Sequence, residues 1–195
     1  MKRELRDSEE PRLLLVGAGK VATQFLTALL FHGFSGKIGV LTRNSRPRPG
    51  LNLSRFSPWA ATGRMPAFEV IPIGLSDTAR LAEWLSDFRP GVIVHAATLY
   101  PSDAIAKLPP DVQRGLERAG IGAFLPCHLA LLAELLAAVG AAGLRPDVIN
   151  CAYPDAVNAA IGPVPGVQFL GSGNVNNNIP ALRCAAAELL DAEPE

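Results

Sequence analysis

Residues 12–22 read Arg-Leu-Leu-Leu-Val-Gly-Ala-Gly-Lys-Val-Ala, and this stretch decides the fold. The apolar run 12–16 has the continuous pattern of a strand that is buried on both faces of a parallel sheet. It ends at Gly17, and helical character follows over residues 23–32. The intervening glycines therefore lie in a turn from a buried strand into a helix, which predicts the first unit of an alternating strand–helix fold.

The rest of the chain repeats this alternation. The expected strands are 12–16, 37–42, 68–73, 91–96, 147–151 and 167–170. The expected helices are 23–32, 77–88 with Ser76 as N-cap, 112–118, 124–142, 154–160 and 179–190. Residues 44–64, rich in Pro, Arg, Asn and Ser, are expected to form a long loop, and 1–11 a flexible extension. Six strands of this kind predict an α/β fold with a doubly wound parallel sheet, order 3-2-1-4-5-6, as a single domain over residues 1–195.

Composition excludes several classes of protein. The chain has 195 residues, of which 49% are hydrophobic and 18% charged, so it can bury a large core. Its apolar stretches are interrupted too early to span a bilayer, and its N-terminus lacks the apolar region of a secretory signal. The three cysteines (Cys127, Cys151 and Cys184) lack the spacing of a zinc site, which favours reduced thiols. We therefore expect a cytoplasmic protein with no metal and no membrane partner.

Charge is unevenly distributed along the chain. Residues 1–64 carry 11 Lys and Arg against 4 Asp and Glu, whereas residues 65–195 carry 7 against 14, giving +7 and −7. No acidic residue occurs between Glu10 and Glu69. The basic residues are not interleaved with aromatic ones as they are in many nucleic-acid-binding surfaces, so we expect no nucleic-acid partner.

The first turn has the pattern Gly17-x-Gly19-x-x-Ala22, which suits a dinucleotide. The first glycine permits the tight turn, the second lets a pyrophosphate approach the backbone, and the alanine lets the helix pack closely. The pyrophosphate would then lie on the helix N-terminus, where free N–H groups favour an anion. The alternative is that the glycines serve an ordinary strand–helix turn. The residues expected at the cofactor here are Gly17, Gly19, Lys20, Val21 and Ala22.

The residues at the end of the second expected strand indicate which dinucleotide the site would bind. A site for NAD has Asp or Glu there to bind the ribose 2′-hydroxyl, whereas this chain has Thr42 and Arg43. Arginines suit a 2′-phosphate, so we predict NADP(H) over NAD(H) as the cofactor, with Thr42, Arg43, Asn44 and Arg46 at the site. The alternative is a solvated basic loop. The missing acid also argues against an S-adenosylmethionine site.

Small residues follow the fourth expected strand. Ala96, Ala97 and Thr98 would let the ribose and nicotinamide lie against the backbone, since ligands bind outside the carboxyl ends of such strands. His95, one residue earlier, is a candidate catalytic residue, with packing against the sheet as its alternative.

Polar residues follow the last two expected strands. Asn150 and Tyr153 lie across the crevice from the first turn and are candidates to contact substrate, and Tyr153 is also a candidate catalytic residue. The alternative is turn chemistry before Pro154. Asn174 and Asn176 are further substrate candidates, with loop and cap roles as their alternative.

Two resemblances support this interpretation. Residues 13–44, LLLVGAGKVATQFLTALLFHGFSGKIGVLTRN, resemble NADP-dependent dehydrogenases with a Rossmann fold, such as pyrroline-5-carboxylate reductases. The back, from GVIVHAA to GVQFLGSG, is similar to the N-terminal domain of the lactate and malate dehydrogenases. The resemblance implies a dinucleotide-binding Rossmann domain. In that family the catalytic histidine lies in a second domain, and Tyr153, Asn177 and Pro180 stand where the family has Asn, Asp and Arg.

The function that follows is an NADP(H)-dependent oxidoreductase domain for a small carbonyl or imine substrate. Because the proton donor is missing, we expect another domain or protomer to complete the active site, either in a homo-oligomer or through a second domain. The Tyr-x-x-x-Lys pair of short-chain dehydrogenases is absent after both Tyr100 and Tyr153. The alternative is a non-catalytic NADP(H)-binding sensor or interaction module.

Overall fold

The computed structural model describes residues 10–43, 49–63, 65, 67–100, 102–172 and 175–190. The strands are β1 (Arg12–Val16), β2 (Lys37–Leu41), β3 (Glu69–Ile71), β4 (Val92–His95), β5 (Asp147–Asn150) and β6 (Gln168–Gly171). The helices are α1 (Lys20–Phe31), α2 (Pro49–Thr62), α3 (Thr78–Phe88), α4 (Ser102–Ile105), α5 (Pro110–Ala119), α6 (Leu125–Ala141), α7 (Pro154–Ile161) and α8 (Val175–Leu190), with a 3-10 turn η1 (Gly120–Ala123).

The six strands form one parallel sheet in the order β3-β2-β1-β4-β5-β6. Leu13 pairs with Ile38 on one side and with Val92 on the other, so β1 is central although it is first in the chain. The predicted fold class and strand order are therefore confirmed.

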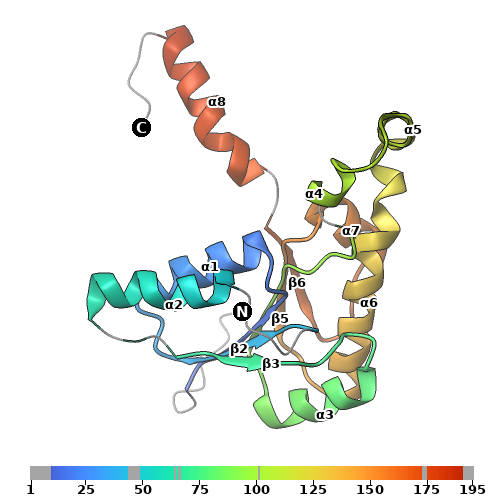
Figure 1. Ribbon diagram of the computed structural model, residues 1–195. Coiled ribbons are helices and arrows are strands. Elements are labelled where there is room, and N and C mark those ends of the chain that lie inside the picture. The colour runs from blue at the N-terminus through green and yellow to red at the C-terminus, as the bar shows by residue number, and fades with distance from the viewer. Residues whose placement is uncertain are drawn as a thin grey trace.

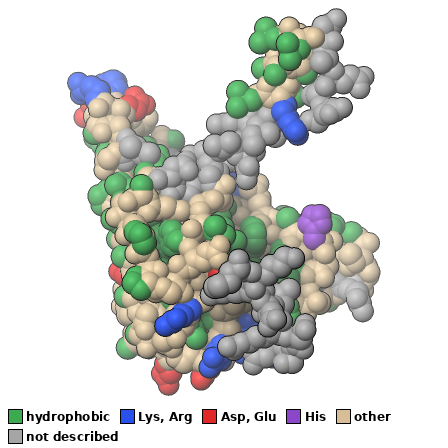
Figure 2. Space-filling view, turned by 180° about the vertical axis from the view of Figure 1, so that it is seen from behind, with side chains coloured by type: hydrophobic (Ala, Val, Ile, Leu, Met, Phe, Trp, Pro, Cys, Tyr) green, Lys and Arg blue, Asp and Glu red, His purple; other side chains and the backbone are tan. Residues whose placement is uncertain are grey.

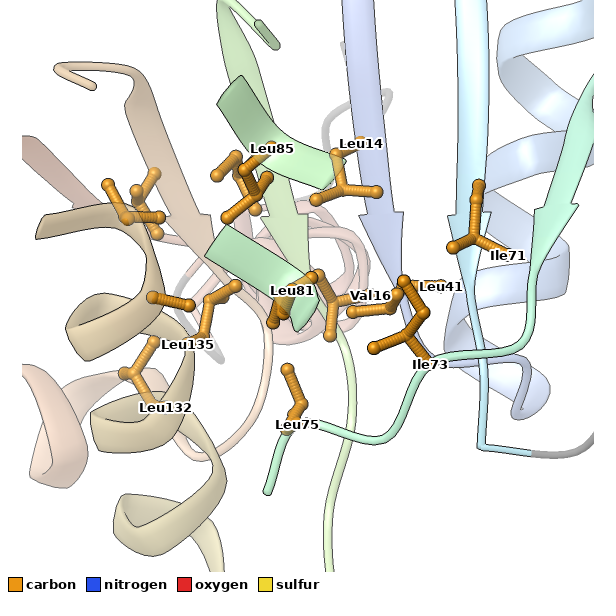
Figure 3. Close-up of a cluster of buried hydrophobic side chains, with 14 of the residues drawn as sticks. Leu14, Val16, Leu41, Ile71, Ile73, Leu75, Leu81, Leu85, Leu132 and Leu135 are labelled. Carbon is orange, nitrogen blue, oxygen red and sulfur yellow. The ribbon is translucent and has the colours of Figure 1, made fainter. Parts of the chain in front are cut away.

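Alternation along β1 divides the core into two layers. Leu14 and Val16 point to one face and pack with residues of α3 and α6, whereas Leu13 and Leu15 point to the other and pack with α1. Figure 3 shows the first layer, in which leucines of α3 and α6 meet side chains of β1 and β2. On the second face lie α1, which connects β1 to β2, and α2, which connects β2 to β3 (Figure 1).

The predicted loop over residues 44–64 is wrong, because residues 49–62 form α2. The apolar pattern did not predict this helix because much of its inward side is polar or small. Ser54 is buried and accepts a hydrogen bond from the Thr27 hydroxyl at 3.0 Å, while a Cβ on Gly50 would lie 3.2 Å from Thr23 Cγ2. Leu51 is buried in the core, but Leu53, Phe56 and Trp59 are exposed. An apolar-periodicity argument therefore finds no continuous inward stripe. Residues 44–48 of the expected loop and 1–9 of the expected extension lie outside the described residues.

Other helix boundaries also differ. The N-cap of α3 is Asp77, whose carboxylate accepts a hydrogen bond from the Arg80 N–H, rather than Ser76. Asp is as good a cap as Ser, so the sequence does not separate the two positions. Helix α8 begins at Val175 rather than at residue 179, and it stands clear of the other elements (Figure 1). Within the described residues, no helix has the length and apolar character needed to cross a bilayer.

Candidate functional site

The turn between β1 and α1 is held between the ends of two other strands. Gly17 has φ +109°, and its N–H donates a hydrogen bond to the Leu41 carbonyl of β2 at 2.9 Å. A Cβ at this position would lie 3.1 Å from the carbonyl oxygen of Ala96, which follows β4. Both the backbone conformation and the close approach therefore require glycine here.

Gly19 differs from Gly17 because the space beside it is open. It is the N-cap of α1 with φ −83° and ψ −172°, and a Cβ added there would meet nothing within 4 Å. It has no side chain to cap the helix, so the first-turn N–H groups and the helix dipole remain available to an anion. Ala22, one turn on, is fully buried, as close packing of α1 on the sheet requires.

A pocket of about 220 Å³ opens at this turn, along the carboxyl ends of β1, β2 and β4. It brings together seven of the residues predicted for the cofactor: Gly17, Gly19, Thr42, Arg43, Ala96, Ala97 and Thr98. Lys20 and Val21 begin α1 with exposed side chains and do not line it. Asn44 and Arg46 lie outside the described residues.

Apolar side chains that sequence reasoning missed complete the pocket. They are Val16, Ala18, Leu41, Ile73, Leu75, Leu99 and Leu131. Ile73 and Leu75 follow β3, so the rule that ligands bind outside the carboxyl ends of strands would have found them. Leu131 comes from α6, and nothing local in the sequence marks it as a lining residue.

The polar groups of the pocket are few. Arg43 is exposed and is the one charged side chain among the described lining residues, and none of those residues carries a carboxylate. The hydroxyl of Thr98 is engaged in its own turn, since it accepts from the Tyr100 N–H at 3.1 Å and lies 3.3 Å from the Tyr100 carbonyl. The described part of the pocket therefore offers a cation and backbone donors to an anion.

His95 lies at the end of β4 but is fully buried and does not line the pocket. Both ring nitrogens lack a hydrogen-bond partner among the described residues. Burial, with a smaller contribution from His128, lowers the pKa of His95 to about 4. The imidazole is therefore neutral at neutral pH, which fits the packing alternative better than proton donation.

Tyr153 directly precedes α7 in the left-handed conformation, with φ +51°. Its ring stacks on His128 of α6, with centroids 4.5 Å apart, and the residue is 39% exposed. Burial lowers the pKa of His128 as well. The contact between His128 and Tyr153 joins residues from two elements that no local pattern in the sequence connects.

Asn150 ends β5 with its side chain fully buried. Its amide nitrogen donates to the Asn158 side-chain oxygen at 2.9 Å and to the Ala152 carbonyl at 3.2 Å, and its oxygen accepts from the Ala152 N–H at 3.0 Å. These contacts tie the end of β5 to α7, which is the turn role that we gave as the alternative to substrate contact.

The side chains of the two remaining substrate candidates are not described by the structure. Asn174 lies outside the described residues, and Asn176 lies in the first turn of α8, where its side chain is outside the description. In the described ranges, no three His, Cys, Asp or Glu side chains gather as a metal ion would require.

Comparison with known proteins places the fold. No protein-family model matches the chain, and no curated protein does. Among solved structures, the lactate dehydrogenase of Eimeria maxima with NADH and oxamate is 15% identical, with a TM-score of 0.59 over 95% of this chain and 50% of that one. MGS-M5, a lactate dehydrogenase from a Medee basin deep-sea metagenome library, is 12% identical, with a TM-score of 0.58 over 96% and 52%.

The chain is shorter than the proteins it is similar to. It spans about half the length of these lactate dehydrogenases. It spans 39% of WbmG of Bordetella bronchiseptica, solved with NAD, which is 17% identical over 75% of this chain with a TM-score of 0.43. The similarity to the lactate dehydrogenases shows that the chain has the Rossmann-type fold of NAD-binding enzymes.

Proposed function

We propose that this chain is the dinucleotide-binding domain of an oxidoreductase that prefers NADP(H) and acts on a small carbonyl or imine substrate. The observation that carries the proposal is the pocket itself. In it, the glycine turn, the N-terminus of α1, Arg43 and the backbone after β4 converge at the carboxyl edge of the sheet. This is the place where a doubly wound sheet binds a ligand.

The residues present fit a dinucleotide. The open space beside Gly19 leaves room for a pyrophosphate on the helix N-terminus, and the small side chains of Ala96 and Ala97 leave the backbone after β4 accessible. When bound, the cofactor would supply or accept a hydride. The chain's own part is to bind the phosphates and to orient the ring against the carboxyl end of β4.

The preference for NADP(H) rests on Arg43. It follows β2, where a carboxylate would accept a hydrogen bond from a ribose 2′-hydroxyl, and no described residue of the pocket is acidic. A guanidinium at this place would donate to a 2′-phosphate and would have nothing to repel it. The lactate dehydrogenase of E. maxima was solved with NADH. The proposed preference for NADP(H) therefore rests on Arg43 and not on the similarity to that enzyme.

The test is a pair of calorimetric titrations of the purified chain, one with NADPH and one with NADH. We expect NADPH to bind at least about tenfold more tightly, because one charge-assisted hydrogen bond contributes on this scale. Equal affinities would remove the claim of NADP(H) preference and keep the site. If neither nucleotide binds, the glycine turn serves the fold alone.

A second candidate function is a binding module without turnover. It is favoured by the absence of any carboxylate, histidine, lysine, cysteine or tyrosine among the described lining residues, so a proton donor must come from elsewhere. Another domain or a second protomer would supply it under the first proposal. A panel of 2-oxo acids and cyclic imines with NADPH separates the two, because tight NADPH binding without oxidation of NADPH by any substrate favours the module.

A further inference from the structure

On the side of the sheet where α1 lies, Val94 of β4 is buried with residues of α1, but the described helices leave the β5–β6 end of this face less covered. On the side of the sheet where α1 lies, the strands β4, β5 and β6 present Val92, Ile149, Cys151 and Leu170. Ile149 and Leu170 are register partners, so their side chains stand next to each other on this face. We call these four residues the open half-sheet.

Burial on the two sides of the same strands shows the difference. Ile93 and Val148 point toward α6 and are completely buried. On the open half-sheet, Leu170 is 44% exposed and Val92, Ile149 and Cys151 are half-buried. Parallel sheets have both faces covered, because crossover helices occupy both. The open half-sheet is therefore an apolar surface that the described helices cover only in part.

Helix α8 carries a matching apolar surface. Leu182, Ala186 and Leu189 are spaced by four and three residues, which places them on one stripe, while Arg183 and Glu188 lie to its sides. Leu182 is 63% exposed and Leu189 is 87% exposed. Figure 1 shows α8, which follows β6 in the chain, projecting beyond the sheet.

We infer that two copies of this chain exchange α8, so that the Leu182–Leu189 stripe of each copy covers the open half-sheet of the other. Each chain supplies one partly covered half-face and one uncovered helix, and a reciprocal exchange about a two-fold axis buries both without leaving a further site for growth. Figure 2 shows hydrophobic side chains exposed on α8 where the helix projects from the body of the molecule. This proposal does not depend on the cofactor.

The first test is the mass of the chain in solution, measured by light scattering after size exclusion. We expect a dimer for the natural sequence and a monomer for Leu182→Asp/Leu189→Asp, with the dissociation constant raised by more than about 100-fold, because two buried leucines are lost from each helix. Glu188→Lys, on the same helix but off the stripe, should remain a dimer. Leu53→Asp, on the exposed side of α2, should remain a dimer too.

The second test separates exchange between copies from closure of α8 onto its own sheet. Leu170→Asp damages the open half-sheet and leaves the helix intact, whereas Leu182→Asp/Leu189→Asp does the reverse. Each variant alone should be monomeric. A mixture of the two should contain a heterodimer, because the intact helix of the first variant can cover the intact half-sheet of the second.

The reactivity of Cys151 provides a readout of the same surface. Cys151 lies in the open half-sheet and Cys184 is exposed on α8 away from the stripe. Iodoacetamide should label Cys184 readily in every variant, and Cys151 at least about tenfold faster in Leu182→Asp/Leu189→Asp than in the natural dimer. A natural chain that is monomeric, a dimer that survives Leu182→Asp/Leu189→Asp, or a variant mixture without heterodimer would overturn the proposal.

Discussion

The ring of Tyr153 lies against His128, with 4.5 Å between ring centroids and 24° between ring planes. This contact joins α6 to the residue that precedes α7. Tyr153 has φ +51°, a conformation that non-glycine residues seldom adopt. Tyr153→Leu keeps a Cβ at this position but loses the stacked ring, so it should lower the free energy of unfolding by about 1 kcal/mol. Tyr153→Phe is the control and should unfold in urea like the natural chain. Equal losses in both variants would assign the effect to the hydroxyl.

Stability should fall as the pH falls below 6.5. The pKa of His95 is about 4 in the folded chain against an ordinary 6.5, so the unfolded state binds the extra proton between these values. The shift corresponds to about 3 kcal/mol that is present above pH 6.5 and lost by pH 4. The lowered pKa of His128 acts in the same direction. Urea unfolding from pH 7 to pH 4 should show the slope, and His95→Leu should reduce it. An unchanged slope in that variant would contradict the assignment.

Arg43→Ala should weaken NADPH binding by about 10- to 100-fold and NADH binding by less than threefold, since the guanidinium would contact the 2′-phosphate alone. Calorimetry with both nucleotides measures the two losses. Arg114→Ala, on α5 and away from the pocket, should change neither affinity. Equal losses for the two nucleotides would mean that Arg43 does not discriminate between them.

The two glycines of the first turn should respond differently to a methyl group. Gly17→Ala places a Cβ 3.1 Å from the Ala96 oxygen at φ +109°, so it should destabilise the fold by about 1–3 kcal/mol. Gly19→Ala meets no atom within 4 Å and should cost about 1 kcal/mol or less, while filling space beside the helix N-terminus and abolishing measurable nucleotide binding. Thermal unfolding and calorimetry together check the contrast. Undiminished binding by Gly19→Ala would place the pyrophosphate elsewhere.

Asn150 and Asn158 should be energetically coupled, because their side chains are hydrogen bonded at 2.9 Å. Asn150→Leu removes the partner of the Ala152 N–H as well, and should lower the free energy of unfolding by about 2 kcal/mol. Asn158→Ala should lower it by about 1 kcal/mol, and the double variant should lose less than the two single variants combined. Additive losses would show that the bond between the two amides contributes nothing to stability.

The strand order and the first turn were predictable because their signals are local. Residues 13–16 are all apolar, and these four buried positions match a strand covered on both faces. Helix α2 was not predicted, because its inward side combines Leu51 with Gly50 and Ser54, while Leu53 is exposed and breaks the apolar pattern. The contact between α1 and α2 depends on small and hydroxyl-bearing residues in both helices. The sequence of either helix alone therefore does not indicate it.

Some features of the candidate site were also predictable from the sequence, and others were not. Gly17, Gly19, Arg43 and Ala96 line one pocket, since each follows a strand that the sequence predicted; that they bind a cofactor stays a prediction. The engagement of Asn150 with Asn158, the neutral state of His95 and the stack of Tyr153 on His128 arise from packing between elements. A residue's place at a strand end was therefore readable from the sequence, but the contacts that occupy its polar atoms were not.

The central place of β1 has a consequence for the nascent chain. Leu13 pairs with both Ile38 and Val92, so a ribosome delivers β1 and its first neighbour well before it delivers β4. Until β4 emerges, one edge of the most apolar strand has no partner, and an unpaired edge can recruit another chain. Parallel pairing between distant strands is also slow to form, because the chain loses the entropy of loop closure before the contacts between the strands stabilise it. A chaperone that binds extended apolar segments would therefore find its target in residues 12–16 during the synthesis of the middle of the chain.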